Sequence, residues 1–250
     1  MMALFECAMD IGEQMLISGA EVHRVEESVN RMCYAFGAKR VDVFIITSSM
    51  VATVYTESGE TFTQTRRVTS SKFNIEKLHR LNSLCRDVCS APITAEDMRA
   101  RLESALNCKQ FPAWLELLSS AVIAGSFTLF FGGNWVETVI SFGIGALVWL
   151  CQFWADRIVP NKIFGKFYGS AIATLLAFAA LRFGWISSMD NVIIGNIMTL
   201  IPGVGLTNAI RDLFSGDSIA GLLRLIDAAL TALAIAAGYY LIAVLGGFFI

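Results

Sequence analysis

A polar, helix-breaking stretch lies inside a strongly apolar part of the chain, between residues 191 and 210. Pro202 has no amide hydrogen and interrupts a helix, and Gly203 adds backbone freedom at the next position. At lipid depth the freed carbonyls must be satisfied inside protein or in a wet cavity, and broken helices of this kind often form solute-binding sites. The alternative is a kink that only shapes packing. The candidate residues for a transport path are Asn196, Thr199, Pro202, Gly203, Thr207, Asn208, Arg211, Asp212 and Asp227.

Charged residues follow this break. Arg211, Asp212 and Asp217 come directly after the apolar stretch, and Arg224 and Asp227 are spaced to pair on one helix face. An ion pair of this kind is structural more often than functional. A carboxylate beside a membrane is nevertheless a candidate for proton coupling, and Asp227 is such a candidate.

A second group of ionisable residues opens the helix predicted over residues 21–36. Its members are Glu21, His23, Arg24, Glu26 and Glu27. His23 and Glu27 are one helical turn apart and are predicted to share a face. Carboxylates at a helix N-terminus also simply stabilise the helix, so a solvated helix start is the alternative. A weaker candidate on the third predicted strand consists of Thr63, Thr65 and Arg66.

The sequence predicts no catalytic residue set, no metal site and no cofactor. His23 has only Glu27 as a neighbour at helical spacing, and neither an HExxH motif nor a phosphate-binding glycine loop is present. The six cysteines include no CxxC pair and are expected to be small apolar side chains. A net charge of −2, with no basic run longer than two residues, argues against nucleic acid as a partner.

The elements that position these residues differ sharply between the two parts of the chain. Residues 1–110 carry 13 of the 19 Lys and Arg and 14 of the 21 Asp and Glu. The remainder contains uncharged stretches long enough to cross a bilayer, whereas a soluble helical core of this size would leave too few polar residues to cover it. We therefore predict a lipid bilayer as partner and five spans, near residues 115–133, 136–155, 167–185, 191–210 and 225–248.

The basic residues of the short loops predict the orientation. Most of them flank the ends of the predicted spans on the side of the N-terminal domain: Lys109, Arg157, Lys162, Lys166, Arg211 and Arg224. The opposite side carries only Arg182. We thus expect a multi-pass protein of the cell (inner) membrane, with a cytoplasmic N-terminal domain and the C-terminus outside.

The N-terminal domain, residues 1–110, is predicted to be a small cytosolic α+β domain. Apolar spacing predicts helices over 3–18 and 21–36, and β-prone runs predict strands over 40–47, 50–57 and 60–68. Two further helices are expected near 74–90 and 94–107, the second with Thr94 as its N-cap. The fold class is therefore an α-helical integral membrane protein, with about five transmembrane helices, preceded by this domain.

Two stretches resemble the threonine/serine exporter (ThrE-like) family. They are "IGEQMLISGAEVHRVEESVNRMCYAFGA", followed by "TFTQTRRV", and "LIPGVGLTNAIRDLFSGDSIAGLLRLIDAAL". The resemblance implies a proton-driven secondary transporter that exports threonine, serine or small dicarboxylates. It also likens the soluble domain to hydrolases. The residues it points to are Gly19, Glu21, Arg24, Glu26, Pro202, Gly203, Asn208, Arg211, Asp212 and Gly216.

Full-length members of that family are expected to have about ten spans, so the resemblance implies a second, smaller membrane subunit. A homo-oligomer is left open. Our interpretation is a transporter subunit, not an enzyme, that exports a small polar substrate. The main alternative is a membrane-anchored hydrolase with its active site in the N-terminal domain, although a single span would suffice as an anchor. An assembly subunit without a site of its own is a third hypothesis.

Overall fold

The computed structural model describes residues 1–108, 111–158 and 161–247. The chain packs as two compact units. The α/β unit comprises Met1–Lys109 and Val204–Leu225, and the helical unit comprises Gln110–Gly203 and Ile226–Ile250. The expected domain boundary at 110, the basic residue Lys109 and the expected span end at 248 lie outside the described residues. Segment 204–225, which the sequence analysis placed in the membrane domain, packs with the α/β unit instead.

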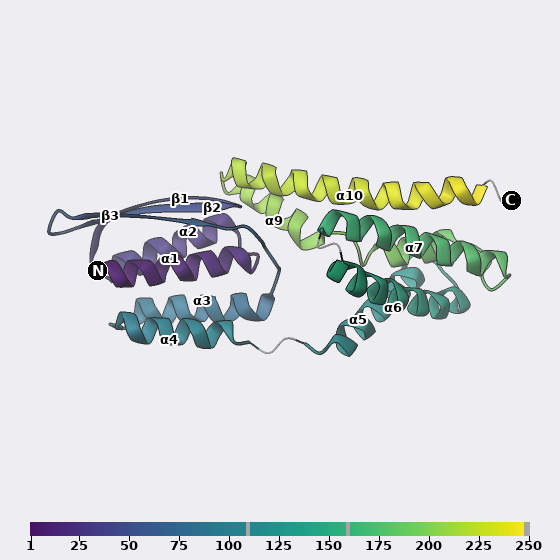
Figure 1. Ribbon diagram of the computed structural model, residues 1–250, viewed down its shortest axis with the longest axis horizontal. Helices are drawn as coiled ribbons and strands as arrows, with labels where there is room; N and C mark the ends of the chain where they lie inside the picture. Colours follow the sequence, from purple (N-terminus) through teal and green to yellow (C-terminus); the bar gives the residue numbers. More distant parts are fainter. Residues whose placement is uncertain (109–110, 159–160, 248–250) are drawn as a thin grey trace. The chain divides into compact units, whose positions relative to one another are not determined.

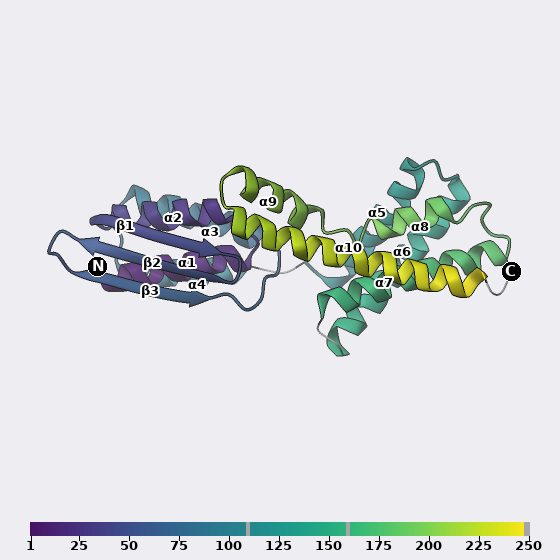
Figure 2. The same cartoon turned by 90° about the horizontal axis from the view of Figure 1, so that it is seen from above.

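The α/β unit has the order of elements that the sequence predicts. These are α1 (Met2–Ile17), α2 (Val22–Ala35), β1 (Ala38–Ile46), β2 (Ser49–Thr56), β3 (Thr61–Arg67), α3 (Ile75–Ser90) and α4 (Ala95–Leu106). Two later segments complete the unit, α9 (Gly203–Phe214) and the start of α10 (Ser218–Gly247). The strands form an antiparallel sheet in the order β1-β2-β3. Figures 1 and 2 show this sheet on one side of the α1–α2 layer and α3 with α4 on the other.

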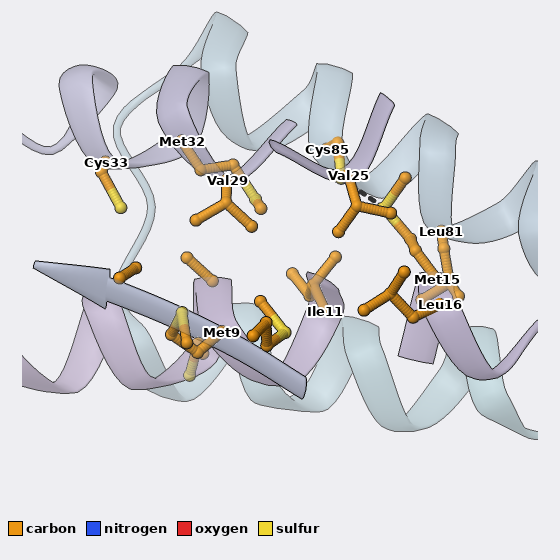
Figure 3. Packing of buried hydrophobic residues seen from close by; sticks show 14 of the residues in the cluster. Met9, Ile11, Met15, Leu16, Val25, Val29, Met32, Cys33, Leu81 and Cys85 are labelled. Carbon is orange, nitrogen blue, oxygen red and sulfur yellow. Dashed lines mark hydrogen bonds between the residues drawn. The ribbon is translucent and has the colours of Figure 1, made fainter. Parts of the chain in front are cut away.

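The core of the α/β unit forms around α1, because this helix lies between the sheet and the α3–α4 layer. Its apolar residues are therefore buried on several sides rather than along one stripe. Figure 3 shows Met15 of α1 meeting Cys85 of α3, with Val25 and Val29 of α2 close by. Half-buried and buried residues alternate strictly along strand β2. Its buried residues, Met50, Ala52, Val54 and Thr56, face the helices. The sheet thus covers α1 and α2 with one face and leaves the other face open.

The helical unit consists of α5 (Ala113–Phe130), α6 (Trp135–Ile158), α7 (Lys162–Arg182), α8 (Asp190–Ile197) and the rest of α10. In the described residues, four helices are long and apolar enough to cross a membrane: Ala113–Phe130, Trp135–Ala155, Ile163–Arg182 and Ser218–Gly246. Only 11–39% of each is buried within the chain, so their apolar faces are available to lipid or to another membrane chain. These helices correspond to the first, second, third and fifth predicted spans.

The fourth predicted span, 191–210, is not a single helix. Helix α8 ends at Ile197, a turn follows, and α9 begins at Gly203. The amides of Thr199 and Leu200 bond carbonyls three residues back, which tightens and ends α8, and Pro202 then has no amide hydrogen with which to continue it. With eight residues, α8 is too short to span a bilayer. The described part of the chain therefore contains four helices that could each span a bilayer, and the fifth expected span, which is interrupted, is not confirmed.

Hydroxyl and amide side chains hold α5, α6 and α8 together inside the helical unit. Asn196 donates to Ser141 Oγ at 2.7 Å and to the Val192 carbonyl at 2.8 Å. Ser141 Oγ lies 2.6 Å from Thr128 Oγ1, and all three of these side chains are at most 1% exposed. Such interhelical hydrogen bonds stabilise helix packing where no water competes. They require close approach, which Gly195 permits, because a Cβ there would overlap Thr128 Oγ1 and lie 2.8 Å from the Ala124 carbonyl oxygen.

Gly195→Ala is expected to destabilise the helical unit by about 1–3 kcal/mol, because the added methyl group overpacks the α5–α8 contact. The matched control is Gly143→Ala in α6, whose added Cβ meets nothing within 4 Å. That change should be neutral or slightly stabilising. Thermal unfolding of the two purified variants in detergent measures the difference. Equal midpoints would contradict the packing described here.

Candidate functional site

The turn between α1 and α2 presents backbone carbonyls for side chains to bind. The Gly19 amide bonds the Leu16 carbonyl and the Ala20 amide bonds the Met15 carbonyl, each at 3.0 Å, which is a Schellman ending of α1. Gly19 has φ +91°, and a Cβ at this position would overlap the Phe73 ring. Glycine is therefore required here on two counts. The carbonyls of Gly19 and Ala20 remain free for partners outside the two helices.

One face of α9 binds this turn. Asn208 Nδ2 donates to the Gly19 carbonyl at 3.1 Å, and the Arg211 guanidinium pairs with the Glu21 carboxylate. Asp212 Oδ1 accepts the Val22 amide at 3.2 Å, so its carboxylate caps the N-terminus of α2. Asn208, Arg211 and Asp212 are spaced i, i+3 and i+4, which places them on a single helical face.

Arg224, in the part of α10 that belongs to the α/β unit, completes the arrangement. Its Nη2 donates to the Ala20 carbonyl at 2.7 Å, and its Nε lies 3.2 Å from Asp212 Oδ2. The Asp212 side chain is 1% exposed and that of Arg224 is 15% exposed. We call the turn Gly19–Val22 together with Asn208, Arg211, Asp212 and Arg224 the latch. Removing one partner of a buried pair leaves an uncompensated charge, so the latch members depend on one another.

The turn between α9 and α10 sets the geometry of the latch and adds a further carboxylate. Gly216, with φ +94°, ends α9, and the Asp217 amide bonds the Asp212 carbonyl at 2.9 Å. Gly221 allows α9 and α10 to approach closely, because a Cβ there would lie 2.9 Å from the Ala209 carbonyl oxygen. One side-chain oxygen of Asp217 is buried without a hydrogen-bond partner among the described residues.

Two carboxyl groups near the latch are electrostatically perturbed. Burial raises the pKa of Glu26, and the charge of Asp217 raises it further, while the Ile45 amide, which donates to Glu26 Oε1 at 3.1 Å, opposes the rise. Burial also raises the pKa of Asp212, against the effect of the Arg224 guanidinium and the Val22 amide. Protonation of these two carboxyl groups is therefore linked to the packing of α2 against β1 and α9.

The latch gathers only part of the soluble-domain candidates predicted from the sequence. Gly19 and Glu21 are members, and Glu26 lies beside it. His23 and Arg24 are exposed, and Glu27, one helical turn after His23 on α2, forms a 2.6 Å salt bridge with Arg31. The strand candidates lie elsewhere: Thr65 is on the open sheet face, and Arg66 pairs with Asp10 of α1 at 2.9 Å.

The transport-path candidates are divided between the two units. The α/β unit contains Asn208, Arg211, Asp212 and the exposed Thr207. The helical unit contains Asn196, Thr199, Pro202, Gly203 and Asp227. Asn196 is sealed in helix packing. Asp227 is exposed, and the pair predicted between it and Arg224 is wrong, because Arg224 binds the buried Asp212 and the Ala20 carbonyl instead.

Thr199 borders an open groove of about 470 Å³ in the helical unit. The groove is also lined by Glu116 and Ser119 of α5 and by Trp149 and Gln152 of α6. None of these four residues was among the candidates predicted from the sequence. A usable signal was the recurrence of small polar residues at helical spacing within an apolar segment.

The described residues offer little for hydrolytic or metal chemistry. Burial raises the pKa of the Cys33 and Cys85 thiols to about 12, so both remain protonated and unreactive at neutral pH. Across residues 1–108, 111–158 and 161–247, no group of three His, Cys, Asp or Glu is arranged to hold a metal ion.

Asp212→Ala is expected to destabilise the α/β unit by about 3 kcal/mol, because Arg224 and the α2 N-terminus lose a buried partner. Hydrogen exchange in the full chain should accelerate in peptides covering residues 18–26. The control is Asp87→Ala on α3, an exposed position where about 0.5 kcal/mol or less is expected. Adding Arg224→Met to the first variant should recover part of the loss. Unchanged exchange in Asp212→Ala would refute the role of the latch.

Glu26→Gln is expected to change how stability depends on pH. Because the pKa of Glu26 is raised above its ordinary 4.5, the folded chain binds this proton more tightly than the unfolded chain. The contribution of Glu26 to the unfolding free energy therefore grows as pH falls through the raised pKa towards 4.5, and it is lost at neutral pH.

The Gln variant should accordingly be at least as stable as the wild type at pH 7 and should gain less on acidification. Glu27→Gln, which removes only an exposed salt bridge, serves as the control. Unfolding midpoints measured between pH 4.5 and 7.5 test this difference, and parallel curves for all three proteins would exclude it.

Comparison with known proteins relates this chain to one family of membrane proteins. The sequence model of the ThrE family, described as "Putative threonine/serine exporter", matches residues 6–246. "Pheromone-regulated membrane protein 10" of Eremothecium gossypii is 28% identical over 93% of this chain and 32% of its own length. A "Probable succinate transporter subunit" of Klebsiella aerogenes is 26% identical over 93% of this chain and 88% of its own length. No solved structure matches the chain.

The chain spans only part of most of these relatives. It covers 22–32% of the length of the first fungal proteins. It is 25% identical to the "Threonine/serine exporter" of Corynebacterium glutamicum over 92% of this chain, which corresponds to 49% of that protein. Since the family match extends over nearly all of the chain, including both the latch and the α8–α9 break, the chain belongs to the ThrE family of threonine/serine exporter proteins.

Proposed function

We propose that this chain is a subunit of a secondary transporter that exports small polar metabolites, of the threonine and serine type or small dicarboxylates. The observation that carries the proposal is the break between α8 and α9 in a chain with four bilayer-length helices. Thr199 of the break borders a mainly apolar groove that also contains polar side chains. In transporters, interrupted helices present backbone and side-chain polar groups to a solute without exposing them to lipid.

The latch is proposed to control this break. Helix α9 follows the break directly in the chain and is held by Asn208, Arg211 and Asp212, while α8 is held separately by Asn196. A change in the turn Gly19–Val22 would alter the restraint on α9 and hence on the residues before it. The α/β unit would then gate transport, with protonation of Asp212, Glu26 or Asp227 as the coupling step.

The proposal includes a second, smaller membrane subunit of the same family. A relative of nearly the same length is named as a transporter subunit, whereas the named exporter is about twice as long. The open apolar faces of the four long helices are consistent with such a partner or with a homo-oligomer. We also propose that the protein lies in the inner membrane with the α/β unit in the cytoplasm and the C-terminus outside, as the basic loop residues indicate. In this orientation the interrupted segment between α7 and α9 makes the return crossing.

No observation favours the membrane-anchored hydrolase. The relatives are named as membrane proteins, exporters and transporter subunits. The latch is made of structural ion pairs and caps, and it holds no activated nucleophile among the described residues.

The direct test is efflux of labelled threonine, serine and succinate from cells that express the full chain, alone and with a co-encoded small membrane protein of the same family. Export of at least one substrate above the level of empty cells is expected when both proteins are present. Absence of efflux for all three substrates in both arrangements, with the proteins present in the membrane, would exclude the proposed function.

Pro202→Ala restores an amide hydrogen at the break and is expected to favour a continuous α8–α9 helix. Efflux should fall several-fold while the amount of protein in the membrane stays the same, because a hinge affects turnover more than folding. Pro92→Ala, in the loop between α3 and α4, controls for loss of a proline. Equal efflux by both variants would remove the break from the mechanism.

A further inference from the structure

The groove beside Thr199 has the size and lining of a small-molecule site. Its volume of about 470 Å³ lies within the range of roughly 300–1,000 Å³ that is typical of ligand pockets. Leu115, Ile123 and Trp149 supply apolar surface, and polar side chains from three separate segments converge between them. A wall built from α5, α6 and the turn after α8 would hold a ligand against a helix break.

The hydroxyl groups of this wall all donate hydrogen bonds to backbone carbonyls. Ser119 Oγ donates to the Leu115 carbonyl at 2.8 Å, and Ser120 Oγ donates to the Gly145 carbonyl at 3.1 Å. Thr199 Oγ1 donates to the Asn196 carbonyl at 2.8 Å. With each hydroxyl proton committed to the backbone, the three oxygens offer lone pairs to the groove.

Gln152 behaves in the same way: its side-chain amide nitrogen donates to the Gly165 carbonyl at 3.3 Å, so its side-chain oxygen remains as an acceptor. Glu116 then adds a negative charge. Its exposed carboxylate forms no ion pair or side-chain hydrogen bond with any residue in the described ranges. The groove is therefore rich in acceptors and carries a charge that favours a cation with several N–H donors.

We propose that this groove binds the protonated amine of a small substrate, with Glu116 as the residue that determines specificity. The inference deepens the proposed export function, on which it rests, by assigning its substrate class. A primary ammonium group matches the Glu116 carboxylate and the neighbouring oxygens, whereas a dicarboxylate would meet like charge and few donors. The structure thus favours amino compounds over small dicarboxylates for this chain.

Glu116 also lies in the first turn of α5, where any carboxylate stabilises the helix. The matched control is therefore Asp190→Asn, which removes an exposed carboxylate from the first turn of α8 outside the groove lining. Glu116→Asp keeps the charge and tests rescue.

The first arm measures binding without transport. The purified full chain in detergent is equilibrated with labelled L-threonine and challenged with ethanolamine, an amine without a carboxylate, or with succinate. Ethanolamine should displace threonine and succinate should not. Glu116→Gln should weaken threonine binding about ten- to a hundred-fold, as expected for loss of a charge-assisted hydrogen bond. Glu116→Asp should recover part of this, and Asp190→Asn should bind like the wild type.

The second arm measures efflux of threonine and succinate by the same variants. If the wild type binds threonine as described but exports nothing, the export function fails and the groove assignment stands. If export occurs but Glu116→Gln lowers threonine and succinate efflux equally, or neither, the groove assignment fails alone. Displacement of threonine by succinate rather than ethanolamine, or absence of threonine binding by the wild type, would also overturn it.

Discussion

A carboxylate buried at the start of α2 organises the α/β unit. Asp212 accepts the first amide of that helix and faces Arg224, which in turn binds the carbonyl of Ala20. Neither charge is stable in this position without the other, since each has lost most of its hydration. The contact joins residues 190 positions apart. It brings the end of α9, where Gly216 stops the helix, to the turn that follows Gly19 at the end of α1. The close approach of α9 and α10 at Gly221 accompanies this arrangement.

The helical unit is held together mainly by hydroxyl and amide side chains. Asn196, Ser141 and Thr128 form hydrogen bonds between helices, and Glu137, the buried acid of α6, is fully used by the amides of Asn134 and Ser188. Unpaired charge is expensive at membrane depth, whereas hydroxyl and amide contacts are inexpensive where glycine permits close approach. The groove beside Thr199 differs because it is open, and Glu116, the charged residue among its described lining residues, lies at a helix start.

The two modes of anchoring restrain the two sides of the α8–α9 break separately. Helix α8 is fastened by its amide network and α9 by its ion pairs, so the residues between them connect two separately restrained elements. Pro202 prevents the helix from simply running through, which would merge the two sets of restraints. A segment of this kind can change conformation while its flanks remain folded, as the proposed transport function requires.

Local patterns in the sequence determined the elements: the helix–strand–helix order of the α/β unit, the Thr94 cap, the bilayer-length apolar helices and the interruption at Pro202. These depend on interactions within a few residues, which composition and periodicity report directly. Only the tertiary structure decided that α9 joins the α/β unit, that Arg224 serves Asp212 rather than Asp227, and that Glu116 borders a groove with Thr199. Those contacts join distant residues whose burial depends on the whole packing, and no local pattern encodes which partner a charge will find.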